Sequence, residues 1–454
     1  MYRLRNSFAL ALLRLLLVLS FISAGLVQSA QGDTVRLLDD DNVSLAARFQ
    51  LIDSARWRID WACFELRKDV VTYAVLARLQ EAARRGVDVR LVIDAYGNRV
   101  PQSILANLVE NGVQVRRYHP LRFEDVRNYT QRMHDKLIIA DGQVMILGGR
   151  NLGAVYFGHA AEKNFRDRDV EVTGATVHRA SAYFERLWTS RHVVAAKCCC
   201  EDRPISPNWE RPPPNSPLGV PMRSPRQWLQ RGLEDSYSGD LVPDLGGSVR
   251  PTLNIPPDRI HFLYSSRIFP GHSPDISDQL LGLIESARRE ILIETPYLIL
   301  SARFQDALRA AVGRGVCVRV LCNSLASIDK PLVHAGYVNQ KKSMLRIGID
   351  LWEFQGPDML HAKAMLIDGC AVIGSYNLHP RSEYYDTEIA IVITDIKFLA
   401  ELRTLVDRHF ERAVRVDRSP GYRVSRKRNG HPPTRRIVWM QLLRLPALLL
   451  EKHL

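Results

Sequence analysis

Short apolar runs alternate with longer helical patterns along this chain, and the same order of segments occurs twice. An apolar run at residues 59–66 precedes a helical stretch and then a strand pattern at residues 89–93. A second apolar run, at residues 291–300, precedes another helical stretch and a strand pattern at residues 318–322. In both places an Arg-Gly-Val triplet stands before the second strand, as expected of a turn between helix and strand. This self-similarity predicts an internal duplication.

Each copy continues with a further helix and strand, which end near residues 112–115 and 348–351. Alternating strand and helix patterns predict an α/β fold with a largely central sheet in each half. We therefore expect two duplicated repeats, at residues 31–197 and 258–415. Residues 198–257 hold twelve of the 24 prolines, which favours an interdomain linker, interrupted by a short helix near residues 227–233.

The two ends of the chain have compositions of their own. Residues 1–30 combine Arg3 and Arg5 with a nearly continuous apolar run, which is typical of a signal peptide or membrane anchor. We therefore expect a protein of the cell membrane or the periplasm. Residues 416–454 form a basic tail with an apolar, Trp439-containing end, and contact with a membrane or docking on the core both remain open.

The overall charge narrows the class of partner. A net charge of +13 favours polyanionic surroundings, either an anionic membrane face or a nucleic acid, and does not separate the two. The seven cysteines are scattered, odd in number and not in zinc spacing, so no metal site is expected. We interpret the run at residues 198–200 as incidental thiols, with a lipidated or redox-active patch as the alternative.

The residues that carry candidate chemistry occur once in each repeat, as H-x-K-x4-D followed by small residues and Asn. They are His134, Lys136, Asp141, Gly148, Gly149 and Asn151 in the first repeat, and His361, Lys363, Asp368, Gly374, Ser375 and Asn377 in the second. Alternation along a strand puts His and Lys on one face. There the ammonium neutralises a phosphate oxygen while the imidazole attacks phosphorus or moves a proton. Chance explains one such motif, but two copies in matching places predict a phosphodiester-processing site.

The rest of each motif predicts a hairpin, with an Asp-Gly turn between two apolar strands. Asp141 and Asp368 are therefore interpreted as turn residues without a direct chemical role. The small residues after each hairpin let the backbone approach a ligand closely, and the two asparagines then present amide donors. The second hairpin is one residue shorter than the first, which we expect a tighter turn to absorb.

These motifs resemble the signature of the phospholipase D superfamily, and the bacterial cardiolipin synthase C-type branch is the most similar part of it. The similarity runs from about Leu37 to His409, with the linker poorly matched. Besides the two motifs, it rests on the segments at residues 152–157, 333–337, 380–382 and 387–388.

The resemblance implies two repeats packed about a pseudo-twofold axis, with both His-Lys pairs around one phosphate and no cofactor. One histidine forms a phosphohistidine, and the other protonates the leaving alcohol and then activates water or an alcohol. The resemblance assigns these roles to His134 and His361 in that order, which the near symmetry of the motifs leaves open. Each imidazole needs an orienting carboxylate. We expect these at Glu388 and, by strand alignment, at Asp169 rather than Glu171.

Several functions remain to be weighed. A phosphatidyltransferase acting on phospholipid at an anionic membrane agrees best with the targeting segment, the tail and the resemblance. A hydrolytic phospholipase D would use the same residues with water as acceptor. A nuclease of the same superfamily would suit the charge, but no nucleic-acid module is recognisable, so no nucleic acid is expected as partner. A non-enzymatic binding protein would be expected to lose part of a motif, and both are complete. One chain supplies both motifs, so no oligomer is required.

Overall fold

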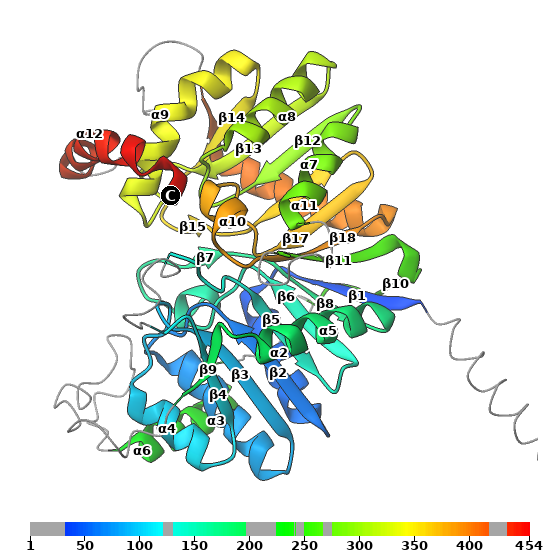
Figure 1. The fold of residues 1–454 in the computed structure, drawn as a ribbon, viewed down its shortest axis with the longest axis vertical. Helices are drawn as coiled ribbons and strands as arrows, with labels where there is room; N and C mark the ends of the chain where they lie inside the picture. Colours follow the sequence, from blue (N-terminus) through cyan, green and yellow to red (C-terminus); the bar gives the residue numbers. More distant parts are fainter. Residues whose placement is uncertain are drawn as a thin grey trace, which may run out of the picture.

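The computed structural model describes residues 32–120, 130–196, 224–239, 241, 249–266, 275–416 and 434–454. The expected export segment at residues 1–30 and the cysteine run at residues 198–200 lie outside these residues. The described chain forms two large sheets, each flanked by helices, and a short two-stranded sheet that links them (Figure 1).

The first sheet has nine strands, in the order β10-β1-β8-β6-β5-β2-β3-β4-β9. Their bounds are β10 (Leu253–Ile255), β1 (Asp33–Leu38), β8 (Asp169–Thr173), β6 (Val144–Gly148), β5 (Lys136–Ala140), β2 (Arg58–Cys63), β3 (Asp88–Asp94), β4 (Gln114–Tyr118) and β9 (Val193–Ala195). β2, β3 and β4 are mutually parallel, and the other neighbouring pairs are antiparallel.

The second sheet has eight strands, in the order β11-β18-β17-β16-β12-β13-β14-β19. Their bounds are β11 (Ile260–Tyr264), β18 (Ile389–Ile393), β17 (Cys370–Gly374), β16 (Ala364–Ile367), β12 (Glu290–Glu294), β13 (Cys317–Asn323), β14 (Asp350–Phe354) and β19 (Ala413–Arg415). Strand for strand, this order repeats that of the first sheet from β1 to β9, with β10 as the additional edge strand. The expected duplication of an α/β unit is thus confirmed.

The helices follow the same duplication and form distinct layers. The outer face of the first sheet packs against α2 (Asp41–Ser54), α3 (Val70–Arg84), α4 (Gln102–Glu110) and α6 (Pro225–Tyr237). The outer face of the second packs against α7 (Ile276–Ser286), α8 (Ala302–Gly313) and α9 (Pro331–Ile347). α5 (Ala175–Thr189) and α11 (Ile396–Glu411) contribute to a central core that also takes side chains from the inner faces of both sheets.

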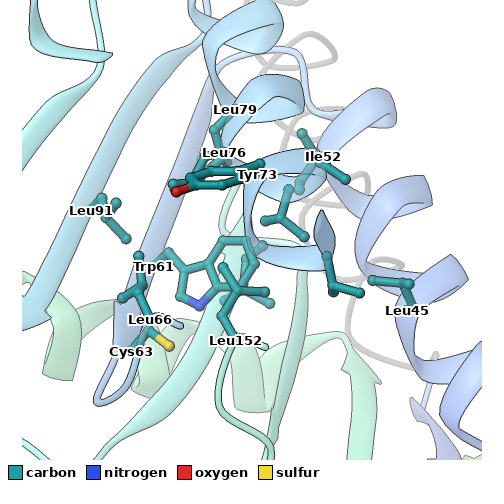
Figure 2. Packing of buried hydrophobic residues seen from close by; sticks show 14 of the residues in the cluster. Leu45, Ile52, Trp61, Cys63, Leu66, Tyr73, Leu76, Leu79, Leu91 and Leu152 are labelled. Atoms are coloured by element: carbon teal, nitrogen blue, oxygen red, sulfur yellow. The ribbon is translucent and has the colours of Figure 1, made fainter. Parts of the chain in front are cut away.

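Strand β2 illustrates how alternation builds these layers. Trp61 and Cys63 point into the outer core of the first half, whereas Ala62 between them points into the central core. Figure 2 shows Trp61 close to Tyr73 and Leu76 of α3, on the side of the sheet that faces the helices. Ala62, on the inner side, packs in the central core, to which α5 and the second sheet also contribute.

Two segments outside the predicted repeats are structured. The expected helix near residues 227–233 is α6, where Arg78 of α3 donates to the Ser236 hydroxyl at 2.9 Å. Strand β10, also within the predicted linker, pairs with β1. In the tail, α12 (Thr434–Leu449) packs against α9 and is followed by the short helix η5 (Glu451–His453). Within the described residues, no helix has both the length and the apolar character that crossing a membrane requires.

The two halves are joined by short backbone pairings close to the motifs. β15 (Met359–Leu360) of the second half runs parallel to β7 (Phe165–Arg166) of the first. A single parallel bridge joins Met133 to Thr387 in the corresponding place. Each half thus carries the segment just before its own motif alongside a segment of the other half.

Candidate active site

Both His-Lys pairs lie at the start of a central strand rather than within it. Lys136 is the first residue of β5, and the second strand of this kind, β16, begins just after Lys363. The Lys136 ammonium donates to the His134 carbonyl oxygen at 2.6 Å, and the Lys363 ammonium lies 2.8 Å from Nδ1 of His361. All four side chains are buried, so the charged and proton-transferring groups are withdrawn from bulk water.

His134 is held by a carboxylate from the other half of the chain. Its Nδ1 atom lies 3.1 Å from both carboxylate oxygens of Glu388, which precedes β18. The Glu388 carboxylate also accepts hydrogen bonds from the hydroxyls of Ser375 and Ser382. With Nδ1 occupied, Nε2 is the nitrogen of His134 left to react with a substrate.

His361 has the reciprocal arrangement. Its Nδ1 atom hydrogen-bonds the carboxylate of Asp167, which lies in the first half, just after β7. Lys363 is 3.9 Å from the same carboxylate. Each histidine is therefore oriented by an acid from the opposite half.

These contacts between each histidine and an acid of the opposite half follow from the backbone pairings between the halves. Met133 pairs with Thr387, so the next residues along, His134 and Glu388, come together. Leu360 pairs with Arg166, so the next residues there are the second histidine and its acid. The two contacts are thus equivalent under the duplication, and the site is complete only when both halves are in place.

The structure does not place the predicted acid Asp169 beside His361, and Asp167 lies there instead. Counting back one residue from the first apolar strand position selects Asp169 in one repeat and Glu388 in the other. The backbone sets another register, because the Gly149 N–H donates to the Arg168 carbonyl and the Ser375 N–H donates to the Ile389 carbonyl. That register aligns Asp167 with Glu388.

Asp169 instead takes part in buried hydrogen bonds away from the motif histidines. Its carboxylate is fully buried and accepts hydrogen bonds from Ser44 at 2.8 Å, Arg48 at 2.9 Å and Arg150 at 3.2 Å. Glu171 lies further along β8 and pairs with Arg36 at 2.8 Å. Neither carboxylate forms a hydrogen bond with a motif histidine. Acids alternate at residues 167, 169 and 171, so the sequence alone does not reveal which of the three does.

The size of the small residue after each hairpin fits the acid that packs against it. A Cβ atom on Gly149 would lie 2.1 Å from Oδ1 of Asp167, so only glycine fits there. The corresponding residue in the second half is Ser375, whose hydroxyl donates to the Glu388 carboxylate. The difference between Gly149 and Ser375 therefore accompanies the difference between aspartate and glutamate at the two acid positions.

The two asparagines differ in their partners. The Asn151 amide donates to the Tyr156 hydroxyl at 2.8 Å and accepts from the Glu65 N–H at 3.2 Å. Asn377 is also buried, and its Oδ1 has no hydrogen-bond partner among the described residues. Asn377 thus keeps a polar atom that a ligand group can satisfy.

The motif aspartates sit in the hairpin turns, as interpreted from the sequence. Asp141 and Asp368 have positive φ values of 54° and 47°. The Asp141 carboxylate accepts backbone N–H groups of residues 56–58, and the Asp368 carboxylate accepts those of residues 288–290. The first loop has three residues between paired strand ends and the second has two, so the shorter turn does absorb the missing residue.

Burial and the lysine charges control protonation in the site. Burial, Lys136 and Lys363 lower the pKa of His134 well below its usual range. Burial and Lys363 lower the pKa of His361 to about 4, although Asp167 opposes this. The two ammonium groups are affected too, since burial lowers the pKa of Lys136 to about 8 and that of Lys363 to about 7. Both imidazoles are therefore neutral near pH 7 in the absence of a bound anion.

The two acids differ in charge state. Although burial opposes it, Lys363 and His361 hold the pKa of Asp167 below its usual range. Burial raises the pKa of Glu388 well above its usual range, and Lys136 offsets this only in part. An ionised carboxylate thus faces His361, whereas the carboxyl group that faces His134 is biased toward its neutral form.

Aromatic rings line the site, and the sequence offered no motif for them. The Phe64 ring lies 4.9 Å from the His134 ring and 5.1 Å from the Lys136 ammonium. Tyr156 and Phe165 lie 5.2 and 5.3 Å from the His361 ring. A cleft of about 860 Å³ between the halves borders Asp167, but its lining includes none of the four His and Lys residues of the motifs. Within the described residues, no cluster of three His, Cys, Asp or Glu side chains is arranged to hold a metal ion.

Comparison with known proteins agrees with the duplicated fold. The family described as "Cardiolipin synthase, PLD-like domain" matches residues 49–188 and again residues 280–412. The chain is 28% identical over 402 residues to cardiolipin synthase C of Escherichia coli K12, covering 81% of this chain and 82% of that protein. It is 25% identical over 376 residues to cardiolipin synthase B of Salmonella typhi, covering 82% and 79%.

One solved structure supports the fold over nearly the whole chain. The crystal structure of phosphatidylserine synthase from Haemophilus influenzae Rd KW20 superposes with a TM-score of 0.67 at 14% identity. The superposition covers 95% of this chain and 99% of that one.

Proposed function

This chain belongs to the cardiolipin synthase family of phospholipase D-like enzymes, and from that premise we propose that it transfers a phosphatidyl group from a phospholipid to an alcohol, as a cardiolipin synthase does. The observation that carries the proposal is the pair of buried His-Lys motifs, each histidine hydrogen-bonded to an acid of the other half. The names of the relatives, two of them cardiolipin synthases, supply the substrate class.

Binding is the first step. The phosphodiester of the donor lipid carries one negative charge, and Lys136 and Lys363 are the buried cations available to neutralise it. The Oδ1 atom of Asn377 has no partner among the described residues and, as an acceptor, suits a hydroxyl group of the lipid or of the acceptor alcohol rather than a phosphate oxygen. By analogy with other groups that stabilise an oxyanion, loss of one lysine raises the barrier by about 2.7–4 kcal/mol.

In the transfer itself, Nε2 of His134 attacks phosphorus, and the bond from phosphorus to the leaving alcohol breaks. His361 gives its proton to the leaving oxygen. His361 then takes the proton of the acceptor hydroxyl, whose oxygen attacks phosphorus and releases the His134 nitrogen. The phosphohistidine between the two steps preserves the energy of the broken ester bond for transfer.

The assignment of the two roles rests on the acids. The Asp167 carboxylate is ionised and stabilises a protonated His361, as a general acid requires. When Nδ1 of His134 donates its proton to Glu388, the lone pair of Nε2 is free to attack, as a nucleophile requires. A bound phosphodiester offsets the charges of the two lysines and thereby raises the pKa of His361 toward the range in which it can carry a proton.

Lipid analysis tests the proposal directly. The protein is incubated with labelled phosphatidylglycerol, with and without phosphatidylethanolamine, and the lipid products are separated. Cardiolipin indicates transfer, and phosphatidic acid indicates hydrolysis by the same residues with water as acceptor. His134→Asn and His361→Asn should each abolish turnover, and a covalent phosphatidyl adduct on the protein should be trapped only when His134 is present. DNA cleavage without lipid turnover would refute the proposal in favour of a nuclease.

The membrane is the expected place of action, because the donor and acceptor are both lipids. The candidate export segment at residues 1–30 and the net charge of +13 agree with an exported protein at an anionic membrane.

A further inference from the structure

Helix α12 presents a continuous apolar face to solvent. Val438, Trp439, Leu442, Leu445 and Leu449 are 53–77% exposed, which is unusual for side chains of this size. Their spacing of one, three, three and four residues places them along one stripe of the helix. Leu448 and Leu450 extend the same surface and are also exposed. This face is defined here as the α12 stripe.

The opposite face of α12 holds the helix on the second half. Ala447 and Leu454 are buried with Ile299 and Ala335, and Leu443 packs against the same cluster. Polar contacts add to this, because Arg444 donates to the Asn339 side chain at 2.9 Å and Asn339 donates to the Arg444 carbonyl at 2.8 Å. The helix is therefore fixed in position, and the exposure of the α12 stripe does not come from a detached tail.

The charge around the α12 stripe is positive. The helix contains Arg435, Arg436 and Arg444 and no acidic residue. In the sequence, the stretch just before it adds five more basic residues at positions 418, 423, 426, 427 and 428. Apolar side chains with a Trp, flanked by arginines, form the pattern of a helix that lies in the interface of an anionic bilayer.

The position of α12 connects it to the active site. Arg436 donates to the carbonyl oxygen of Ile328, and two residues further along the Lys330 ammonium lies 5.1 Å from the Tyr297 ring. Tyr297 in turn packs edge-on to His361, with 6.3 Å between ring centroids. Short contacts thus lead from one end of α12 to a motif histidine.

The short helix η5, which follows α12, contacts the segment that supports Glu388, the partner of His134. The His453 ring, in η5, lies 5.2 Å from the Tyr385 ring, which directly follows α10 (Pro380–Tyr384). α10 carries Ser382, whose hydroxyl donates to Glu388. Both ends of the segment that ends the chain therefore rest on parts of the molecule that build the site.

From this arrangement we propose that the α12 stripe docks on an anionic phospholipid bilayer and sets the active site at the membrane surface. This inference rests on the proposed function and specifies where the lipid surface binds. In Figure 1, α12 projects beyond the second half of the molecule, where a planar surface can reach it. A second copy of the chain suits the stripe less well, because pairing the same face would bring the arginines of two helices together.

Fluorescence of Trp439 tests the docking in the full-length protein. The chain has seven tryptophans, and Trp57, at 71% exposed, is the matched control on the first half. Vesicles of phosphatidylglycerol with brominated acyl chains should quench part of the emission of the parent protein. Trp439→Phe should lose that part, and Trp57→Phe should keep it. Because the difference between the parent and Trp439→Phe reports this helix alone, an anchor at residues 1–30 does not obscure the result. Equal quenching in parent and Trp439→Phe would overturn the proposal.

Turnover gives a second, independent measurement. Leu442→Glu with Leu445→Glu should lower turnover of phosphatidylglycerol in vesicles about tenfold or more, because two charges then face the acyl chains. Turnover of a short-chain phosphatidylglycerol dissolved as monomers should not change. Ile396→Glu, at a site 82% exposed on α11, serves as the matched control and should leave both rates unchanged.

The outcomes separate docking from chemistry. Loss of both rates to the same extent in the double variant would overturn the docking role. Absence of turnover in the parent on either substrate, with quenching intact, would refute the proposed function and leave the docking supported. A parent that elutes as a dimer, becomes monomeric in the double variant and shows no quenching would assign the stripe to a second copy and overturn the proposal.

Discussion

The Nδ1 atom of His134 lies 3.1 Å from the carboxylate of Glu388, although 254 positions separate the two residues along the chain. The equivalent contact joins His361 to Asp167, which are 194 positions apart. Both histidines are thus oriented across the boundary between the two halves. The register of the short pairings at that boundary decides which acids take part, and this makes the site open to tests by substitution.

Asp167→Asn should lower kcat, and because it also removes a buried charge beside His361 and Lys363, kcat is compared for the folded protein. The amide keeps the size of the side chain but no longer stabilises a protonated His361, and the loss in kcat should reach about 10⁴-fold, as for an acid that orients a catalytic histidine elsewhere. The measurement is kcat together with the free energy of unfolding in urea.

Asp169→Asn is the control for the assignment of Asp167 as the acid beside His361. It should lower the stability of the protein and leave kcat unchanged. It removes a fully buried charge that contacts Arg48 and Arg150, and it should cost about 3–5 kcal/mol of unfolding free energy. The activity of the protein that remains folded should be close to that of the parent. If Asp169→Asn abolished kcat while Asp167→Asn did not, the assignment of the acid would be reversed.

Gly149→Ser should impair the protein, although serine occupies the equivalent position in the second half. The new Cβ would lie 2.1 Å from Oδ1 of Asp167, so either the carboxylate or the backbone must move. Overpacking of this kind costs about 1–3 kcal/mol. We expect a lower kcat together with a lower midpoint of thermal unfolding.

Ser375→Gly provides the reciprocal change for comparison. It removes a hydroxyl that donates to Glu388 without adding any atom, and loss of a partner to a buried acid costs about 1–3 kcal/mol. A Gly149→Ser protein as active and as stable as the parent would contradict the close packing of Asp167 against Gly149.

Asp368→Ala should weaken the fold and leave the chemistry intact. The carboxylate accepts the N–H groups of residues 288–290, and loss of such a cap costs about 1 kcal/mol. Although its slight burial opposes this, those donors lower the pKa of Asp368. Its contribution is therefore fully present above the unfolded-state pKa and is lost as the pH falls through the lower folded-state pKa. Urea unfolding at neutral and acidic pH measures this, and a tenfold drop in kcat would instead give the aspartate a chemical role.

The dependence of kcat/KM on pH should reflect the protonation of Lys136 and Lys363. Burial lowers the pKa of Lys363 to about 7 and that of Lys136 to about 8, and each ammonium neutralises phosphate only while it is protonated. Consequently kcat/KM, which reflects the free enzyme, should fall as the pH rises through this range. Asp167 raises the pKa of Lys363, so Asp167→Asn should move the fall to lower pH, whereas Asp169→Asn should not. An unchanged profile in Asp167→Asn would show that Lys363 does not control it.

Much of the architecture was predictable, because it depends on local patterns. The duplication, the alternation of strand and helix and the Asp-Gly hairpin turns all follow from apolar periodicity and turn chemistry. The hairpins at residues 136–148 and 364–374 consist of two apolar strands and an Asp-Gly turn, and there the expected strands match the structure closely.

The acid at residue 167 was not predictable in the same way. Three acids alternate at residues 167, 169 and 171, and the choice among them depends on one backbone hydrogen bond from Gly149 to Arg168. The exchange between halves is also invisible in the sequence, since it depends on the pairing of Met133 with Thr387 and of Leu360 with Arg166. Long-range register is set by packing, and packing has no local signature.

The exchange of acids has a consequence for biosynthesis. A ribosome makes the first half of the chain, including His134 and its lysine, well before it reaches Glu388. A chain that stops before Glu388 cannot hold His134 against its acid, and one that stops before His361 leaves Asp167 without its histidine. The site can therefore be assembled only after both halves of the chain have been made.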